Sequence, residues 1–442
     1  MTILDRLTME CNQISEYFLA VHGADGFKAL PAASLLHSSV PMSFVMSAGL
    51  IQIENELEQI VAETGPQFCF TQPCFRHFDV KQVGQNSMHL SLFHMSAAFH
   101  MGSTNRNNVL PRLWKFLTKT LNLSANNLWI SYLDDADFGL DQQSYDCWQS
   151  IGVDKTHLIG LDQQHNFWRQ RKSGQIAKDG KKCGPHTEIF YERDDIHCVC
   201  DRSKAIKEQM LNCRCGRFVE ISNSLFIENY IDDNQQLVTA NTVFSECVIG
   251  IERIAMILQQ APSVHHISRF KTSRNALSVF FAQQFPQRIQ TSDTLLTRSF
   301  AIIIDHLSAF VILINDGAPT PGRGGRARIM RNLARAAMTQ ALLHDIDILL
   351  LLQHLLIEQK QQQSRVLLEQ EYNRFATTLT RGKRRLLALY QKKQLITADI
   401  QDQFQSKWGV PPCLFVKFQK ILAADRLITT DDIVNIRKQV SK

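Results

Sequence analysis

The stretch Thr71–Gly102 constrains the fold more than any other part of the chain, because it predicts two apolar strands joined by a polar, glycine-containing loop. The first strand carries Arg76 and Phe78, the loop covers 81–87, and the second strand alternates polar and apolar residues towards Phe99. Alternation with a period of two on both sides of such a loop is typical of an antiparallel hairpin. We therefore expect a hairpin with an arginine near its turn.

Arg76 lies between aromatic residues and suits a planar anion. Its guanidinium can bind a phosphate or a carboxylate through two parallel hydrogen bonds, while a phenyl ring such as that of Phe93 stacks on a purine. Most arginines in such surroundings are salt-bridged surface residues, so this pattern alone leaves both interpretations open.

Further motifs follow the hairpin in a fixed order. After CFRHFDVKQVG and HLSLFHM come NFW at 166–168, CGPHTEIFYE at 183–192, FVEISNSLFIENY at 218–230 and GIERIAMIL at 250–258. This succession resembles the catalytic domain of the alanyl-tRNA synthetase family, a branch of the class II aminoacyl-tRNA synthetases. The resemblance begins near Asp5 and reaches EYNRFATTLTRG at 371–382.

The resemblance implies an α+β fold class, with a class II synthetase antiparallel sheet and flanking helices followed by an all-helical tRNA-recognition domain. Helix and strand patterns alternate up to about residue 260, as an α+β domain requires. We expect the aminoacylation domain at 1–260 with a Cys-rich insert at 193–217, a connector at 261–291, and the helical tRNA-recognition-like domain at 292–442.

The composition is that of an ordinary globular chain, with 44% hydrophobic and 20% charged residues and a net charge of +6. This modest basic excess is compatible with nucleic acid but does not demonstrate it. The N-terminus shows no signal pattern, and the longest apolar run, 348–357, is too short to span a bilayer. We expect a cytoplasmic monomer or dimer without a membrane partner.

Activation of an amino acid by ATP requires cations on the phosphates, Mg²⁺ and a purine slot. Arg76 matches the family's motif-two arginine on the α-phosphate, and Arg253 matches the motif-three arginine on the γ-phosphate. Gly250 precedes it, and we expect its missing side chain to let a helix approach a strand. Glu188 or Glu252 is the Mg²⁺ candidate, although a glutamate at a helix start is often only solvated.

The resemblance also implies a pocket for a small amino acid. It assigns to this pocket Met46, Trp168, Asn223, Glu246, Val248 and Gly250. Met46 belongs to 42–53, which corresponds to the family's first class motif, and a plain core strand explains that segment equally well.

The pocket departs from the family pattern. Glu246 replaces the aspartate that holds the substrate ammonium, and Val248 replaces a glycine. Ser222 stands where the family has tryptophan, which we expect to open space, and His94 replaces the glutamate of FEM. Because a hydrophobic pocket discriminates against one methylene by only about 1–3 kcal/mol, we expect another small amino acid, such as glycine or serine, to be activated as well as alanine or better.

A run of arginines follows in the helix-rich last third of the chain. Such a run binds a nucleic-acid backbone, and the resemblance points to the tRNA acceptor stem; the alternative is a solvated basic helix. The arginines are Arg323, Arg326, Arg328, Arg331 and Arg335. The family's base-reading asparagines lie over Gly322 and Gly324, and its aspartate lies over Ser406, so we expect a different acceptor.

The insert at 193–217 combines basic residues with cysteines. Thiolates at the two ends of a hairpin can converge on Zn²⁺, although C-x-C spacing is tighter than usual and incidental thiols are an equal alternative. The candidate ligands are Cys198, Cys200, Cys213 and Cys215.

Two functions stay open. The first is ATP-dependent formation of an aminoacyl-adenylate and transfer to a tRNA 3′ end, without the family's editing domain, which has no counterpart in these residues. The second is a non-catalytic RNA-binding or regulatory protein derived from a synthetase. Arg76 and Arg253 favour the first, whereas His94 and Ser222 favour the second.

Overall fold

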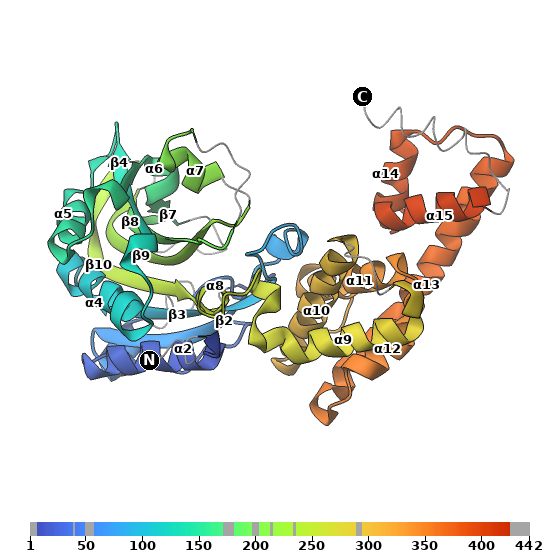
Figure 1. The fold of residues 1–442 in the computed structure, drawn as a ribbon, viewed down its shortest axis with the longest axis horizontal. Coiled ribbons are helices and arrows are strands. Elements are labelled where there is room, and N and C mark those ends of the chain that lie inside the picture. Colours follow the sequence, from blue (N-terminus) through green and yellow to red (C-terminus); the bar gives the residue numbers. More distant parts are fainter. Residues whose placement is uncertain are drawn as a thin grey trace. The chain divides into compact units, whose positions relative to one another are not determined.

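The computed structural model of this chain describes residues 7–38, 40–48, 57–170, 181–196, 203–212, 215–232, 236–288 and 294–424. The chain forms two compact units, Met1–Lys271 and Thr272–Lys442 (Figure 1). The boundary lies at the start of helix α9 (Lys271–Gln284), within the stretch that the sequence suggested as a connector.

The first unit is built on a largely antiparallel sheet of ten strands with the order β1-β2-β3-β10-β9-β8-β4-β5, while β6 pairs with β4 and β7 with β8. The pairs β1–β2 and β4–β6 are parallel. The strands are β1 Lys28–Ala29, β2 Gln67–Phe75, β3 Leu92–Met101, β4 Leu128–Asp135, β5 Gly139–Leu140, β6 Leu158–Leu161, β7 Phe167–Arg169, β8 Lys181–Glu192, β9 Phe218–Ile231 and β10 Leu237–Gly250.

The predicted hairpin is confirmed by β2 and β3, which pair from Gln67↔His100 to Phe75↔Leu92. Its turn is longer than expected, because β2 ends at Phe75 and a 3₁₀ turn follows at Asp79–Lys81. Phe78 lies in this turn and is 58% exposed. Arg76 is therefore the first residue after the strand.

Helices of the first unit flank the sheet. They are α2 Cys11–Ala24, α3 Leu57–Thr64, α4 Leu110–Lys115, α5 Gln142–Ile151, α6 Gln163–Asn166, α7 Ile206–Asn212 and α8 Ile251–Leu258. Apolar residues at helical spacing over 3–21 predict an amphipathic helix, and α2 confirms it for the described part by burying Ile14, Phe18 and His22. His22 and Arg112 of α4 meet side chains of β3 and β10 around a small cavity, so α2 and α4 cover the same face of the sheet.

The opposite face of β2, β3, β9 and β10 carries an aromatic and aliphatic core cluster. Side chains directly opposite in an antiparallel pair point to the same face, so these strands supply one continuous apolar surface. It comprises Ala48, Phe68, Phe70, Ala97, Phe99, Met101, Leu225, Ile227, Phe244 and Val248. Trp168 of β7 packs against this cluster.

The described part of the second unit is helical. Its helices are α9, α10 Thr294–Asn315, α11 Gly325–Leu343, α12 Ile348–Leu355, α13 Gln362–Gln391, α14 Ala398–Ser406 and α15 Pro412–Ala424. α11 buries Met330, Leu333, Ala334 and Ala337 at helical spacing and leaves its polar face outside. The predicted α+β architecture followed by an all-helical region is confirmed.

α10 is a longer apolar helix than the 348–357 run that the sequence singled out. By length and composition alone it could cross a membrane, but 67% of its most apolar window is buried, as in the core helix of a soluble protein. It also contains Asp305, which accepts a 2.8 Å hydrogen bond from His306, and both residues are buried.

Candidate active site

One face of the sheet gathers the predicted substrate residues from β3, β8, β9 and β10. A row of direct partners runs from Phe99 through Glu246 and Leu225 to His186. The next row runs from Ala97 through Val248 and Asn223 to Glu188. Because direct partners share a face, these side chains lie together on the face that carries the core cluster.

Arg76 lies at the edge of this face. Its Nε donates to the backbone oxygen of Met46 at 2.9 Å, and its guanidinium carbon lies 4.9 Å from the centre of the Phe93 ring. Within the described part of the chain, its two terminal nitrogens have no hydrogen-bond partner. The arginine and the aromatic ring predicted for ATP are thus in contact, and the arginine keeps donors available.

Met46 lies in a segment that differs from expectation. The apolar residues of 42–53 predict a strand that enters a helix, which is wrong for the described part, 42–48, because it consists of turns and irregular backbone. This segment is held by backbone hydrogen bonds: Val45 donates to Leu35 at 2.9 Å and accepts from Phe75 at 2.7 Å. It therefore brings the Met46 carbonyl to Arg76 without belonging to the sheet.

Arg253 lies in the first turn of α8. Its Nη1 donates to the backbone oxygen of Glu220 at 2.8 Å and to the Glu220 carboxylate at 3.1 Å, and its side chain is 24% exposed. The role expected for Gly250 is wrong, because the nearest described atom to a Cβ there would be Cδ of Arg253, at 3.8 Å, and its φ of −91° suits any residue. The close approach occurs instead at Gly184, where a Cβ would lie 1.8 Å from the Phe226 oxygen.

Glu246 is a buried carboxyl group without a partner among the described residues. The residue is 7% exposed, and it lies between Phe99 and Leu225 in the sheet. Burial raises the pKa of Glu246 to about 8. Such a carboxyl group is suited to a cationic ligand, because a cation would stabilise its ionised form.

Glu188 has three neighbours, none of them close. Ser131 and Asn223 donate to its carboxylate at 3.5 Å and 3.3 Å, and Nε2 of His186 lies 3.5 Å from Oε1. Burial raises the pKa of Glu188, while the His186 hydrogen bond opposes the rise. A carboxylate with weak protein contacts fits Mg²⁺, a hard cation that prefers oxygen ligands.

Glu252, the other Mg²⁺ candidate, is engaged by protein groups. Its two oxygens accept 2.8 Å hydrogen bonds from the backbone nitrogen and Nδ1 of His94, and Arg269 pairs with Oε1. The residue is 2% exposed. A metal at Glu252 would have to displace these three donors, so Glu188 fits the Mg²⁺ prediction better.

Ser222 does not enlarge the pocket as expected. It pairs with Ile249 and is followed by Asn223, so strand alternation turns its side chain away from the substrate face. Its hydroxyl donates to the Val248 oxygen at 2.9 Å. Of the two proposed pocket changes beside Glu246, only Val248 lies on the substrate face.

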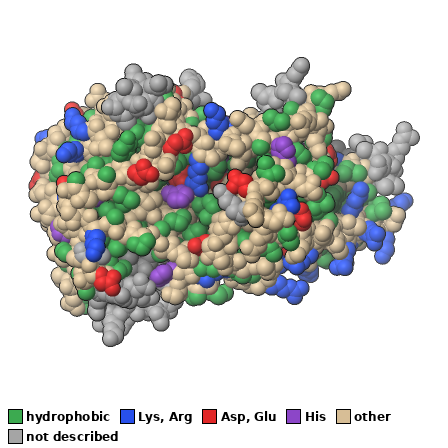
Figure 2. Space-filling model, turned by 90° about the horizontal axis from the view of Figure 1, so that it is seen from below, with side chains coloured by type: hydrophobic (Ala, Val, Ile, Leu, Met, Phe, Trp, Pro, Cys, Tyr) green, Lys and Arg blue, Asp and Glu red, His purple; other side chains and the backbone are tan. Residues whose placement is uncertain are grey.

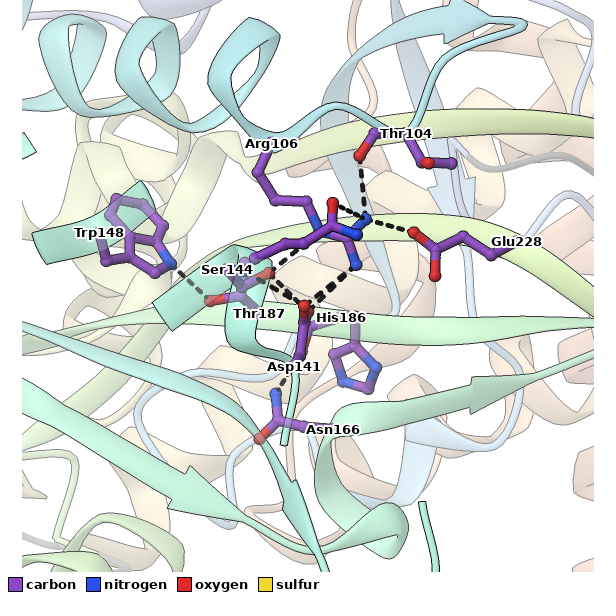
Figure 3. Close-up of polar contacts among 10 residues, drawn as sticks. Thr104, Arg106, Asp141, Ser144, Trp148, Asn166, His186, Thr187 and Glu228 are labelled. Atoms are coloured by element: carbon purple, nitrogen blue, oxygen red, sulfur yellow. Dashed lines mark hydrogen bonds and ion pairs between the residues drawn. The ribbon is translucent and has the colours of Figure 1, made fainter. Parts of the chain in front are cut away.

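His186 was not predicted as a site residue, although it departs from the family's CGPC motif. Figure 3 shows its ring near Asn166, whose amide donates to the His186 backbone oxygen at 2.9 Å. Its Nδ1 is buried and has no partner in the described structure. His186 thus lies on the substrate face, beside Leu225 of β9.

The back of the sheet carries a saturated cation, Arg106. It is 2% exposed, donates to both Asp141 oxygens at 3.2 Å and 3.3 Å, pairs with Glu228, and lies 4.1 Å from the Phe226 ring (Figure 3). This cluster joins the segment before α4, helix α5 and strand β9, which supports the substrate face from behind.

The zinc prediction falls mainly outside the described residues, since only Cys215 of the proposed ligands is described. Within the described ranges, no group of three or more His, Cys, Asp or Glu residues could hold a metal. The zinc site stays a prediction.

The predicted nucleic-acid residues lie at the start of α11 and along it. Arg323 and Arg328 are exposed and Arg331 is half-buried, whereas Arg326 has a pKa lowered by burial. Arg335 donates to Glu371 at 2.7 Å and lies over the Phe375 ring, so it packs α11 against α13. Figure 2 shows Lys and Arg side chains gathered in several groups on one face of the helical unit.

Gly324 has a backbone conformation that disfavours any side chain. Its φ of +78° and ψ of 153° form a conformation that essentially only glycine adopts. Gly322 has no such φ, and a Cβ there would lie 3.3 Å from that of Ala327. Ser406 ends α14, and its hydroxyl donates to the Asp402 oxygen at 2.7 Å.

Residues 13–420 match the family described as tRNA synthetases class II (A). The chain belongs to this family. An alanine–tRNA ligase of Desulforamulus reducens is 26% identical over 327 residues, covering 74% of this chain and 34% of that protein. The alanine–tRNA ligase of Carboxydothermus hydrogenoformans is 25% identical, covering 96% of this chain and 47% of that protein. The chain thus spans a third to a half of the length of these relatives.

Solved synthetase structures resemble the chain more distantly. Apo histidyl-tRNA synthetase of S. aureus gives a TM-score of 0.33 at 9% identity, covering 61% of this chain and 75% of that one. Pyrrolysyl-tRNA synthetase of Desulfitobacterium hafniense gives a TM-score of 0.29 at 12% identity, covering 59% and 73%. The family membership of this chain rests on the sequence match.

Proposed function

We propose that this chain activates a small amino acid with ATP and transfers it to the 3′ end of a tRNA. The observation that carries the proposal is the charge pattern of one face: Arg76 keeps terminal donors, and Glu246 is a buried carboxyl group without a protein cation. An α-amino acid carries the two complementary charges, with its ammonium suited to Glu246 and its carboxylate to Arg76.

In the first step, a carboxylate oxygen of the amino acid attacks the α-phosphorus of ATP. The bond from that phosphorus to pyrophosphate breaks, and the aminoacyl-adenylate forms. Arg76 neutralises charge at the α-phosphate and Phe93 stacks on the adenine, while Arg253 binds the departing pyrophosphate. Mg²⁺ bound at Glu188 would neutralise phosphate charge when present.

In the second step, a terminal tRNA hydroxyl attacks the activated carbonyl carbon and AMP leaves. Arg323, Arg328 and Arg331 are the proposed contacts to the backbone of the acceptor stem. Arginines bind phosphate without reading sequence, and Gly324 provides no side chain for a base. We therefore propose an acceptor that is not selected in the way the family selects alanine tRNA.

The amino acid need not be alanine. Glu246 extends one methylene further than the family's aspartate, and Val248 fills space where the family has glycine. Another small amino acid, such as glycine or serine, should therefore be activated at least comparably. The alternative function, RNA binding without catalysis, is favoured by the glycines at both base-reading positions.

ATP–pyrophosphate exchange with Arg76→Ala and Arg253→Ala tests the proposal. Each variant should lose about 100-fold in exchange rate, because each removes a charge-assisted contact to a phosphate in the transition state. Arg112→Ala is the matched control, since Arg112 pairs with Asp25 on the opposite face at 2.5 Å. Exchange that survives both substitutions unchanged would exclude these arginines from the reaction.

A further inference from the structure

We infer that Glu252 and His94 position the two halves of the ATP site relative to one another. This inference rests on the proposed function. Glu252 directly precedes Arg253, the proposed γ-phosphate contact, and His94 directly follows Phe93, on which Arg76 lies. The buried carboxylate of Glu252 thus joins the start of α8, which carries Arg253, to strand β3, which carries Phe93.

The Glu252 side chain takes the place of a strand partner beyond the end of β10. β10 ends at Gly250, which pairs with Met95, so the backbone N–H of His94 lies just beyond the end of this ladder. Oε2 of Glu252 accepts from that N–H at 2.8 Å. The start of α8 is thereby fixed against β3 at the point where β10 no longer pairs with this strand.

The carboxylate is held as an anion. Burial alone would raise the pKa of Glu252, but the Arg269 cation and the hydrogen bonds from His94 hold it below its ordinary value. Arg269 belongs to the 3₁₀ turn Ser268–Phe270 and also lies 3.1 Å from Nδ1 of His94. A fixed anion with three donors allows little movement of α8.

The geometry gives His94 a role that its sequence did not suggest. A glutamate there, as in the family's FEM motif, would place a second carboxylate beside a buried one, and like charges repel. The imidazole instead supplies a donor to Oε1 of Glu252 at 2.8 Å. The histidine at this position, where the family has glutamate, is therefore as compatible with a retained ATP site as with a lost one.

Equilibrium binding of ATP with Mg²⁺, together with the KM for ATP and for the amino acid, tests the inference. His94→Ala should weaken ATP binding about tenfold, with a much smaller change in the KM for the amino acid, whereas His94→Asn should recover part of the affinity because its amide can donate. His157→Ala is the matched control, since this half-buried histidine binds the Leu128 oxygen elsewhere in the unit.

Equal weakening of both substrates, or unchanged ATP binding in His94→Ala, would overturn the inference. Thermal unfolding shows whether each variant is folded. If His94→Ala is not folded, Glu252→Gln provides a second variant, with the same expected weakening of ATP binding. Wild-type protein that binds ATP but activates no amino acid would contradict the proposed function alone. Wild-type protein that binds no ATP would contradict both.

Discussion

Arg106 and Arg76 lie on opposite faces of one sheet and differ in how their charge is satisfied. Arg106 is enclosed by Asp141, Glu228 and an aromatic ring, whereas Arg76 uses only Nε, on the Met46 backbone. The same contrast holds for carboxylates, since Glu252 has three donors and Glu246 has none among the described residues. Saturated charges stabilise the fold, and unsaturated charges are available to a ligand.

The largest difference should appear when each of the two arginines is replaced by alanine. Arg106→Ala should lower the free energy of unfolding by about 3–5 kcal/mol, because it leaves Asp141 buried without its cation. Arg76→Ala should change it by less than about 1 kcal/mol while abolishing most exchange activity. Urea unfolding of both variants checks the contrast, which fails if Arg76→Ala is the less stable protein.

Glu246→Gln should increase stability while it weakens substrate binding. The folded pKa of about 8 exceeds the ordinary 4.5, so the wild-type contribution to stability is complete below pH 4.5 and is lost as pH rises towards 8. Glu246→Gln has no carboxyl group to ionise and does not lose stability in this way. At pH 8 its free energy of unfolding should exceed that of wild type by about 2–4 kcal/mol.

The KM for the amino acid should rise at least about tenfold in Glu246→Gln, because the ammonium loses its counter-charge. In wild type the same KM should fall as pH rises from 6 to 8, since the ionised carboxylate binds the ammonium. Exchange kinetics across this pH range measure both effects. A KM independent of pH in wild type would argue against Glu246 as the ammonium site.

The smallest effects should come from the helical unit. Arg328→Ala removes an exposed charge and should weaken tRNA binding a few-fold, with the salt dependence of binding reduced by about one phosphate contact. Arg335→Ala should affect stability more than binding, because Arg335 packs against Glu371 and Phe375. Filter binding at several salt concentrations separates the two. Equal losses of binding would show that Arg335 also contacts tRNA.

The sequence predicted the elements that depend on local pattern. Alternation revealed the β2–β3 hairpin, helical spacing revealed α2, and the ordered motifs placed Glu188, Asn223 and Glu246 in one domain. The register of β8, β9 and β10 brings these residues to one face. This register follows from strand pairing and cannot be predicted from the separate motifs.

The wrong predictions concern side-chain direction and distant partners. Ser222 was expected to open space in the pocket, although alternation turns it to the back of the sheet. The contacts of Glu252 with Arg269 and His94 could not be predicted, because they form only in the folded chain. Gly250 was given a steric role that belongs to Gly184, whose neighbour Phe226 comes from another strand. The contacts of Glu252 and Gly184 join segments far apart in sequence, whereas the direction of Ser222 follows from alternation within β9.

ATP–pyrophosphate exchange with a panel of all proteinogenic amino acids, using wild type and Arg76→Ala, tests the central claim most directly. The account predicts exchange with one or more small amino acids, with glycine or serine comparable to alanine or better, and about a 100-fold loss in Arg76→Ala. Failure of every amino acid to support exchange in folded, ATP-binding protein would contradict it.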